Sequence, residues 1–454
     1  MKKILVAVIL VTLINCAAAQ QFWTQVNIDG FGDASNWATP VITVFEGDIY
    51  VGTRNASGTE VWRYDRKTWT QVNQNGFGDI INEESSSMTV FGGSLYVGTG
   101  NGLTGTEVWR YDGKTWTQVN VDGFGDAANW GSSCSVVYNG NLYVGTWNHT
   151  TGTEIWRYDN ITWSQINTDE FGDTNNAASW SMAVYNSSLC VGTWNHITGT
   201  EIWKFDGATW SQINTDGFGD LTNENSSSVA VYDGNLYVGT TNSITGTEIW
   251  KFDGAVWTQT NTDGFGDAAN TDAPSMGAYR GYLIVDGNLY VGTTNSVTGT
   301  EIWKFDGRTW TQINTDGFGD LTNEDSLSMA FCGRILYVGT SNGTTGTEIQ
   351  KTILAPSPYP TPENRSNSNQ QMRPLSQIHI KEAEISLMET QKLIEEAKTE
   401  GKDTKKCEEI LEEAHKALEK AHMYFAGGMY IPANYWALQA LKLLAACEEC
   451  VSSL

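Results

Sequence analysis

The sequence predicts an all-β repeat domain followed by a small α-helical bundle. The segment Gly-Thr-Glu, followed by Val or Ile and usually by Trp, recurs seven times in the chain. Its glutamates are Glu60, Glu107, Glu154, Glu201, Glu248, Glu301 and Glu348, spaced 47 residues apart except for one step of 53. A repeat of about 40–50 residues that holds four short strands is typical of a β-propeller blade. Seven copies therefore predict a seven-bladed β-propeller.

A second motif, Phe-Gly-Asp, recurs with the same spacing. Its aspartates are Asp33, Asp79, Asp126, Asp173, Asp220, Asp267 and Asp320. Between two such motifs, short alternating segments are separated by Gly, Asn and Asp, which is typical of strands and tight turns. Residues 228–232, 236–240, 248–252 and 256–260 are the four strands predicted for one copy, and Asp-Gly pairs form two of its turns.

The two ends of the repeat array predict how the ring is closed. Residues 22–27 form a fourth strand with no preceding partners, and the last copy, residues 328–351, lacks its fourth strand. Pairing these strands would complete the last sheet and remove two exposed edges. A six-residue insertion, residues 280–285, explains the longer step, and Gln350 replaces the usual Trp in the last copy.

The repeat resembles a degenerate kelch repeat. The resemblance rests on Leu-Tyr-Val-Gly-Thr at residues 236–240, Lys-Phe-Asp at 251–253, and Trp257. The second glycine of the kelch doublet is Thr240 here, so the similarity is to the superfamily. It covers residues 22–353 and implies a fold and no particular activity.

Four segments are predicted along the chain. Residues 1–19 match a secretory signal peptide, 20–354 form the propeller, 355–376 form a linker rich in Pro, Ser and Asn, and 377–454 form the helical bundle. The predicted helices are 377–399, 404–426 and 432–450, and part of the bundle is similar to a tetratricopeptide-like unit. We expect a secreted or cell-surface protein without a transmembrane span. Lipid attachment at Cys16 is the alternative form of anchoring.

Charge and cysteine content narrow the possible partners. The formal net charge of −25 repels phosphate backbones, so nucleic acid is not expected as a partner. Glycans and extracellular proteins remain, and the helical bundle offers a second docking surface. Cys407, Cys447 and Cys450 predict a disulfide that clamps two helices, with metal binding as the alternative.

The repeated acidic residues are interpreted as structural joints. Equivalent carboxylates on a ring lie apart and share one environment, whereas a catalytic pair needs two different environments at short range. The sequence shows no such pair and no catalytic triad, so no catalytic residue is assigned. No cofactor is expected. Ca²⁺ bound by the Asn-x-Asp-Gly-Phe-Gly-Asp loops is the alternative to a purely structural role.

Departures from the repeat predict the binding site. Two adjacent copies share Gly-Thr-Trp-Asn-His, and both have an additional Trp in the loop that leads into their first strand. The predicted ligand-binding residues are Trp130, Trp147, His149, Trp180, Trp194 and His196. Flat aromatic rings stack on sugars or other rings. The Phe-Gly-Asp loops and the Gly-Thr-x-Asn loops are expected on one face of the ring, the loop face, and the sequence therefore predicts recognition of a glycan or a protein by this face. An enzyme acting on extracellular glycans and a structural surface scaffold are the alternatives, and the two histidines leave metal binding open.

Overall fold

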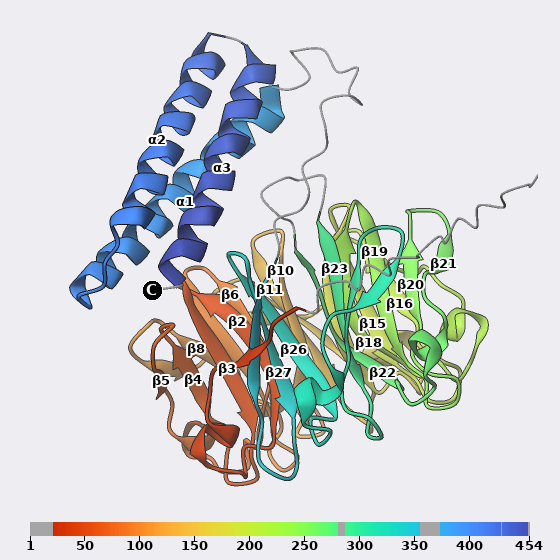
Figure 1. Ribbon diagram of the computed structural model, residues 1–454. Coiled ribbons are helices and arrows are strands. Elements are labelled where there is room, and N and C mark those ends of the chain that lie inside the picture. The colour runs from red at the N-terminus through yellow and green to blue at the C-terminus, as the bar shows by residue number, and fades with distance from the viewer. Residues whose placement is uncertain (1–20, 280–286, 355–372, 428, 453–454) are drawn as a thin grey trace, which may run out of the picture.

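The computed structural model describes residues 21–279, 287–354, 373–427 and 429–452. The signal segment with Cys16, the insertion at 280–285 and most of the expected linker lie outside the described residues. In the rest of the chain, β-strands recur in a fixed order of four, and three long helices follow (Figure 1). The fold class expected from the repeat is therefore confirmed at the level of propeller-like β repeats followed by helices.

Each repeating unit begins with an eight-residue strand. These first strands are β2 (Ala38–Phe45), β6 (Glu84–Phe91), β10 (Gly131–Tyr138), β14 (Ala178–Tyr185), β18 (Asn225–Tyr232), β22 (Asp272–Tyr279) and β26 (Asp325–Cys332). The second strands are β3 (Asp48–Arg54), β7 (Ser94–Gly100), β11 (Asn141–Trp147), β15 (Ser188–Trp194), β19 (Asn235–Thr241), β23 (Asn288–Thr294) and β27 (Ile335–Ser341).

Shorter strands complete each unit. The third strands are β4 (Val61–Tyr64), β8 (Val108–Tyr111), β12 (Ile155–Tyr158), β16 (Ile202–Phe205), β20 (Ile249–Phe252), β24 (Ile302–Phe305) and β28 (Ile349–Ile353). The fourth strands are β5 (Trp69–Gln71), β9 (Trp116–Gln118), β13 (Trp163–Gln165), β17 (Trp210–Gln212), β21 (Trp257–Gln259) and β25 (Trp310–Gln312). The N-terminal β1 (Thr24–Gln25) occupies the fourth place beside β28.

Neighbouring strands within a unit pair antiparallel, as β10 to β13 do in the third unit. The first and last parts of the repeat region are also hydrogen-bonded to each other. Thr24 of β1 lies opposite Lys351 of β28, and Ala38 of β2 lies opposite Ser341 of β27. The pairing expected for the N-terminal strand is therefore present.

The hydrophobic core lies between successive units. Second strands are buried on both faces, because each sheet is packed between two others: Leu142 and Val144 point to one side of β11 and Tyr143 to the other, and all three are at most 3% exposed. Tyr143 packs with Leu189 of the next unit. This arrangement explains why second strands have nearly continuous apolar sequences, whereas outer strands alternate.

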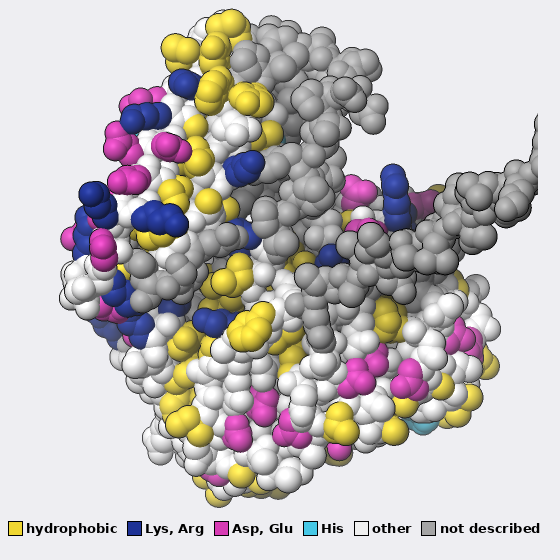
Figure 2. Space-filling model, viewed as in Figure 1, with side chains coloured by type: hydrophobic (Ala, Val, Ile, Leu, Met, Phe, Trp, Pro, Cys, Tyr) yellow, Lys and Arg dark blue, Asp and Glu magenta, His cyan; other side chains and the backbone are white. Residues whose placement is uncertain are grey.

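The helices are α1 (Arg373–Thr399), α2 (Lys405–Ala426) and α3 (Tyr430–Ser452). Helix α1 begins at Arg373, four residues before the predicted start, so the predicted linker extends too far. The earlier start is possible because a proline is tolerated in a first helical turn. Small residues such as Ala414 and Ala440 are fully buried and let the helices approach closely. On its exposed side the bundle mixes acidic and basic side chains (Figure 2).

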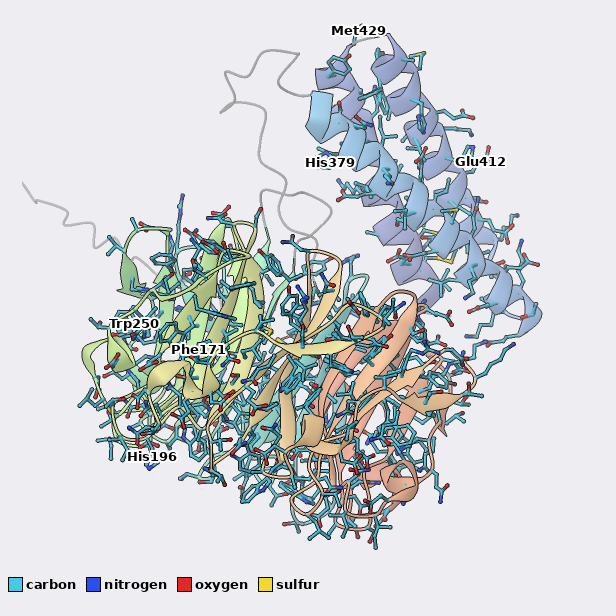
Figure 3. The ribbon with its side chains drawn as sticks, turned by 180° about the vertical axis from the view of Figure 1, so that it is seen from behind. Phe171, His196, Trp250, His379, Glu412 and Met429 are labelled. Atoms are coloured by element: carbon cyan, nitrogen blue, oxygen red, sulfur yellow. A yellow bond between two sulfur atoms is a disulfide. The ribbon has the colours of Figure 1, made fainter. Side chains whose placement is uncertain are left out.

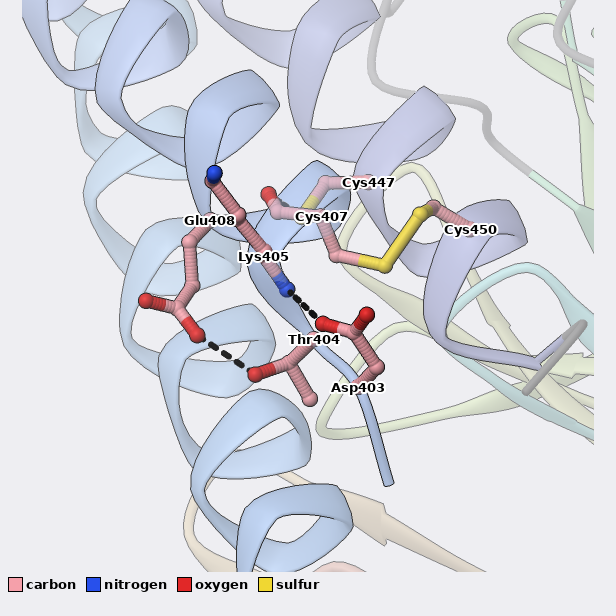
Figure 4. Close-up of a disulfide and its surroundings, with 7 residues drawn as sticks. All are labelled: Asp403, Thr404, Lys405, Cys407, Glu408, Cys447 and Cys450. Atoms are coloured by element: carbon pink, nitrogen blue, oxygen red, sulfur yellow. Dashed lines mark hydrogen bonds between the residues drawn. A yellow bond between two sulfur atoms is a disulfide. The ribbon is translucent and has the colours of Figure 1, made fainter.

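One disulfide fastens the bundle, as expected from the cysteine spacing. Cys407 near the start of α2 is bonded to Cys450 near the end of α3 (Figure 4). Cys447 stays a thiol, and its Sγ lies 3.0 Å from the carbonyl oxygen of Cys407. An ion pair of 2.6 Å between Lys67 and Glu400 joins the bundle to the turn between β4 and β5. No described helix is long and apolar enough to cross a membrane.

Candidate functional site at the loop face

The repeated glutamates fasten the loops that lead into the first strands. Glu154 is 6% exposed and accepts hydrogen bonds from Trp156 Nε1 at 2.7 Å and from Asn129 Nδ2 at 2.8 Å. Burial raises the pKa of Glu154. In the last unit Gln350 Nε2 replaces the Trp and donates to Glu348 at 2.8 Å. These glutamates are thus engaged within the fold, as the joint interpretation predicts, and Gln350 preserves the joint.

The repeated aspartates hold the same loops from the other side. Asp126 Oδ1 accepts the backbone N–H of Ala128 at 2.9 Å, and its Oδ2 accepts Asn148 Nδ2 at 3.3 Å. Asn148 is fully buried, and its amide also donates to Asn129. This network of side-chain amides fixes the residues on either side of it, which include Trp130 and Trp147.

The structure brings the six predicted site residues together. They lie in the third unit (β10–β13) and the fourth unit (β14–β17), at the end of the repeat domain remote from the helices, where His196 is seen in Figure 3. The ring centroids are 5.7 Å apart for Trp130–Trp147, 5.5 Å for Trp130–His149, 5.6 Å for Trp147–Trp180, 5.1 Å for His149–Trp194 and 5.9 Å for Trp194–His196. We call these six residues the aromatic sector.

Trp147 and His149 form the centre of the aromatic sector. Trp147 Nε1 donates a hydrogen bond of 2.9 Å to His149 Nε2, so the Nε2 atom of His149 carries no proton. Partial burial lowers the pKa of His149, and the nearby His196 lowers it further. Within the described residues, no three His, Cys, Asp or Glu side chains converge as metal ligands would. The histidine therefore orients the indole ring and leaves the faces of the rings as the available surface.

Trp180 does not lie in the loop where the sequence placed it. It is the third residue of β14, at a bulge in the pairing with β15, and it lines a central cavity of about 240 Å³. The predicted loop extended too far along the chain, because the first strands begin three residues before their apolar alternation does. These first residues of the strands are rich in Ser. The aromatic sector consequently reaches from the loop face into the cavity.

Sequence reasoning missed a related tryptophan in the first unit. Trp37 follows Asn36 as Trp130 follows Asn129, so the repeat register alone could have identified it. The guanidinium of Arg54 lies 5.0 Å from the Trp37 ring and also pairs with Glu84. A cation covers the aromatic ring there, whereas among the described residues no cation lies over the tryptophan rings of the third and fourth units.

A carboxylate pair also escaped the sequence prediction. Asp272 and Asp325 begin the adjacent strands β22 and β26. Desolvation raises the pKa of Asp272 to about 6, against hydrogen bonds from Ser227 and Thr241, and the negative charge of Asp325 raises it further. Asp272 and Asp325 occupy a position that varies between units, so a comparison of the repeated acids does not include them.

Comparison with solved structures identifies the fold of the repeat region. The extracellular domain of a protein assigned as a one-component system of B. thetaiotaomicron matches with a TM-score of 0.51 and 17% identity, over 73% of this chain and 40% of that chain. The extracellular domain of a hybrid two-component system from the same organism matches with a TM-score of 0.50 and 13% identity, over 74% and 42% of the two chains. This chain thus spans about two fifths of those proteins.

These two matches share the propeller-like β repeats described above. Aleuria aurantia lectin, described as a six-bladed β-propeller, resembles the chain less closely, with a TM-score of 0.40, 12% identity, and coverage of 62% of this chain and 95% of the lectin. No protein-family model matches the chain, and no curated protein matches it. At such identities the similarity establishes the fold alone.

Proposed function

We propose that this chain is a secreted or cell-surface binding protein that recognises a glycan through the aromatic sector. The observation that carries the proposal is the contact among four tryptophans and two histidines on one side of the loop face, with Trp130 37% exposed and His149 and His196 exposed. Exposed aromatic surface has a solvation cost that a buried core residue does not have. A ligand with a flat apolar face would remove that cost.

The chemistry of the site favours a neutral sugar. The chain is strongly acidic, with a net charge of −25, which disfavours phosphorylated ligands. The C–H face of a pyranose stacks on indole rings, and aromatic contacts contribute about 0.5–1.5 kcal/mol each beyond burial. A few such contacts support millimolar to micromolar affinity, since 1 mM corresponds to about 4 kcal/mol. An extracellular protein with exposed aromatic groups is the other partner that fits these rings.

We further propose that the scaffold is a closed, seven-bladed ring. The pairings of β1 with β28 and of β2 with β27 support this arrangement. Closure matters for function because it holds the third and fourth blades rigidly, so that Trp147 and Trp194 keep their separation. Rigid elements position a binding site more accurately than free loops.

A glycan array tests the glycan proposal. The full chain should bind a defined subset of glycans, and Trp147→Ala combined with Trp194→Ala should abolish that binding. Ile244→Ala is the matched control, because Ile244 is 69% exposed on the equivalent loop of the fifth unit, which has no tryptophan there. Unchanged binding by the double variant, with an unchanged thermal midpoint, contradicts the site assignment.

The carboxylate pair supports a second candidate function, hydrolysis of the bound glycan. A carboxyl with a pKa near 6 can act as a general acid at neutral pH when a second carboxylate remains ionised. Release of reducing ends from the glycans that bind, lost in Asp272→Asn, would favour the enzyme. Binding without release would favour the binding protein.

A structural scaffold whose helical bundle docks a partner is the third candidate. Deleting residues 355–454 separates it from the other two, because the glycan array signal would persist while retention at the cell surface would be lost.

A further inference from the structure

Every first strand bends at the same place and turns one residue toward the central cavity. The pairing register skips this residue in each first strand, which is the sign of a β-bulge. The seven equivalent residues all line the cavity and are Pro40, Ser86, Ser133, Trp180, Ser227, Pro274 and Leu327. Bulges re-aim side chains, so the chemistry of this ring of residues differs from unit to unit on one common backbone.

Ser227 shows how a serine at this place is normally satisfied. Its Oγ lies 2.7 Å from Thr241 Oγ1 at the end of β19, and it donates to Asp272 at the start of β22. Thr241 also donates to Asp272, at 2.8 Å. Both hydroxyls therefore donate to the Asp272 carboxyl, and Ser227 is satisfied by a residue of the next unit.

Ser133 is the equivalent serine of the third unit, and it has lost both partners. Trp147 occupies the place of Thr241, and Ala178 occupies the place of Asp272. Neither side chain can accept a hydrogen bond from a hydroxyl. Ser133 is 8% exposed, and its Oγ is buried without a hydrogen-bond partner. Buried polar groups are nearly always bonded, so an orphaned hydroxyl on a cavity wall requires an explanation.

Ser133 and Trp180 both line the cavity, and Trp147 adjoins Trp180. The strand of Ser133, β10, pairs with β11, which ends at Trp147, and Trp180 is the equivalent bulge residue of the next unit. The two rings are 5.6 Å apart. In small-ligand recognition, well-placed polar groups set the orientation and specificity of the ligand.

We propose that Ser133 is the hydrogen-bonding residue of the glycan site, and that it binds a hydroxyl group of a single pyranose ring whose apolar face lies on Trp147 and Trp180. This inference rests on the proposed function. A sugar hydroxyl both donates and accepts, as a serine hydroxyl does, so the pair can form in either direction. The cavity of about 240 Å³ is smaller than the about 300–1,000 Å³ of pockets for drug-sized ligands. A cavity of this size suits a single sugar ring.

The test uses the full chain and the methyl α- and β-glycosides of glucose, galactose, mannose, fucose and N-acetylglucosamine, measured by isothermal titration calorimetry. Ser133→Ala should weaken the best-bound glycoside by about three- to tenfold, the range expected for one hydrogen bond. Its thermal midpoint should be unchanged or higher, because the substitution removes an unsatisfied group. Thr298→Val is the matched control: its Oγ1 is also buried without a hydrogen-bond partner, but Thr298 does not line the cavity, so the affinity should be unchanged.

A series of monodeoxy glycosides then identifies the bound hydroxyl. One deoxy compound should bind the wild type three- to tenfold more weakly than the parent glycoside does. The same compound should bind Ser133→Ala as well as the parent glycoside does, because both changes remove the same interaction. If Trp147→Ala with Trp194→Ala abolishes binding while Ser133→Ala binds every glycoside as the wild type does, the role of Ser133 is wrong and the glycan site stands. If no glycoside binds the wild type, both proposals are wrong.

Discussion

Equivalent positions of the third and fifth units carry opposite chemistry. In the third and fourth units Ser133, Trp147 and Ala178 leave a hydroxyl unbonded beside aromatic rings, whereas in the fifth and sixth units Ser227 and Thr241 both donate hydrogen bonds to Asp272. We call the latter three residues the polar sector. The backbone and the bulge are the same in both. The serine hydroxyl at this position is thus hydrogen-bonded within the protein in the fifth unit, whereas in the third unit it remains available to a ligand.

The largest effect on stability is expected for the repeated glutamates, which occur in the units of both the aromatic sector and the polar sector. Glu154→Ala in the third unit and Glu301→Ala in the sixth each leave a Trp N–H and an Asn N–H without an acceptor. Each should reduce the free energy of unfolding by about 3 kcal/mol, measured by urea denaturation, with the exposed Glu83→Ala as control. Markedly unequal losses would show that the joint is not common to both sectors.

The polar sector should make stability depend on pH in a way the aromatic sector does not. The pKa of Asp272 is raised from 3.8 to about 6 in the folded protein, so folding favours the neutral carboxyl. Its contribution is complete below about pH 4 and is lost as the pH rises through 6. A shift of about two pKa units corresponds to nearly 3 kcal/mol of folding free energy. Because the Asp272 side chain is partly exposed, we expect a contribution of about 2 kcal/mol. Thermal unfolding of wild type and Asp272→Asn between pH 4 and 7 should diverge; parallel curves would contradict this.

The two serines should respond differently to the same substitution. Ser227→Ala removes the hydrogen bond to Asp272 and should destabilise the protein by about 1–2 kcal/mol. Ser133→Ala removes a group without a partner and should cost nothing. Differential scanning calorimetry of both variants checks the contrast. Equal destabilisation would mean that Ser133 has an interaction within the folded chain.

The smallest effect concerns the orientation of Trp147. Its N–H donates to His149 Nε2, which must be unprotonated to accept it. Burial lowers the pKa of His149. The hydrogen bond is therefore fully formed at a pH above the ordinary histidine pKa of 6.5, and it is lost as the pH falls through the lowered pKa. Glycan affinity of the wild type should fall a few-fold on acidification, as followed by calorimetry. His149→Gln should show a flat profile, and a wild-type profile equally flat would remove His149 from the site.

Much of the site could be predicted from the repeat because register maps equivalent residues onto one face. That reasoning correctly brought Trp130, Trp147, His149, Trp194 and His196 together. It misplaced Trp180, because a bulge adds one residue to the strand and changes the direction of the side chain. It also overlooked Ser133 and Asp272, since a serine in a Ser-rich strand and an aspartate near a turn are unremarkable until their neighbours in the next unit are known.

The sequence by itself determined the repeated strand order, the pairing of the N-terminal strand and the joints made by the glutamates, because these depend on local spacing and on one side-chain type in every copy. Only the tertiary structure decided which hydroxyls are bonded and which carboxyl has a raised pKa. Those properties arise between residues of different units, such as Ser227 with Asp272 or Ser133 with Ala178. Their chemistry depends on a distance across a blade boundary, and linear spacing does not contain that distance.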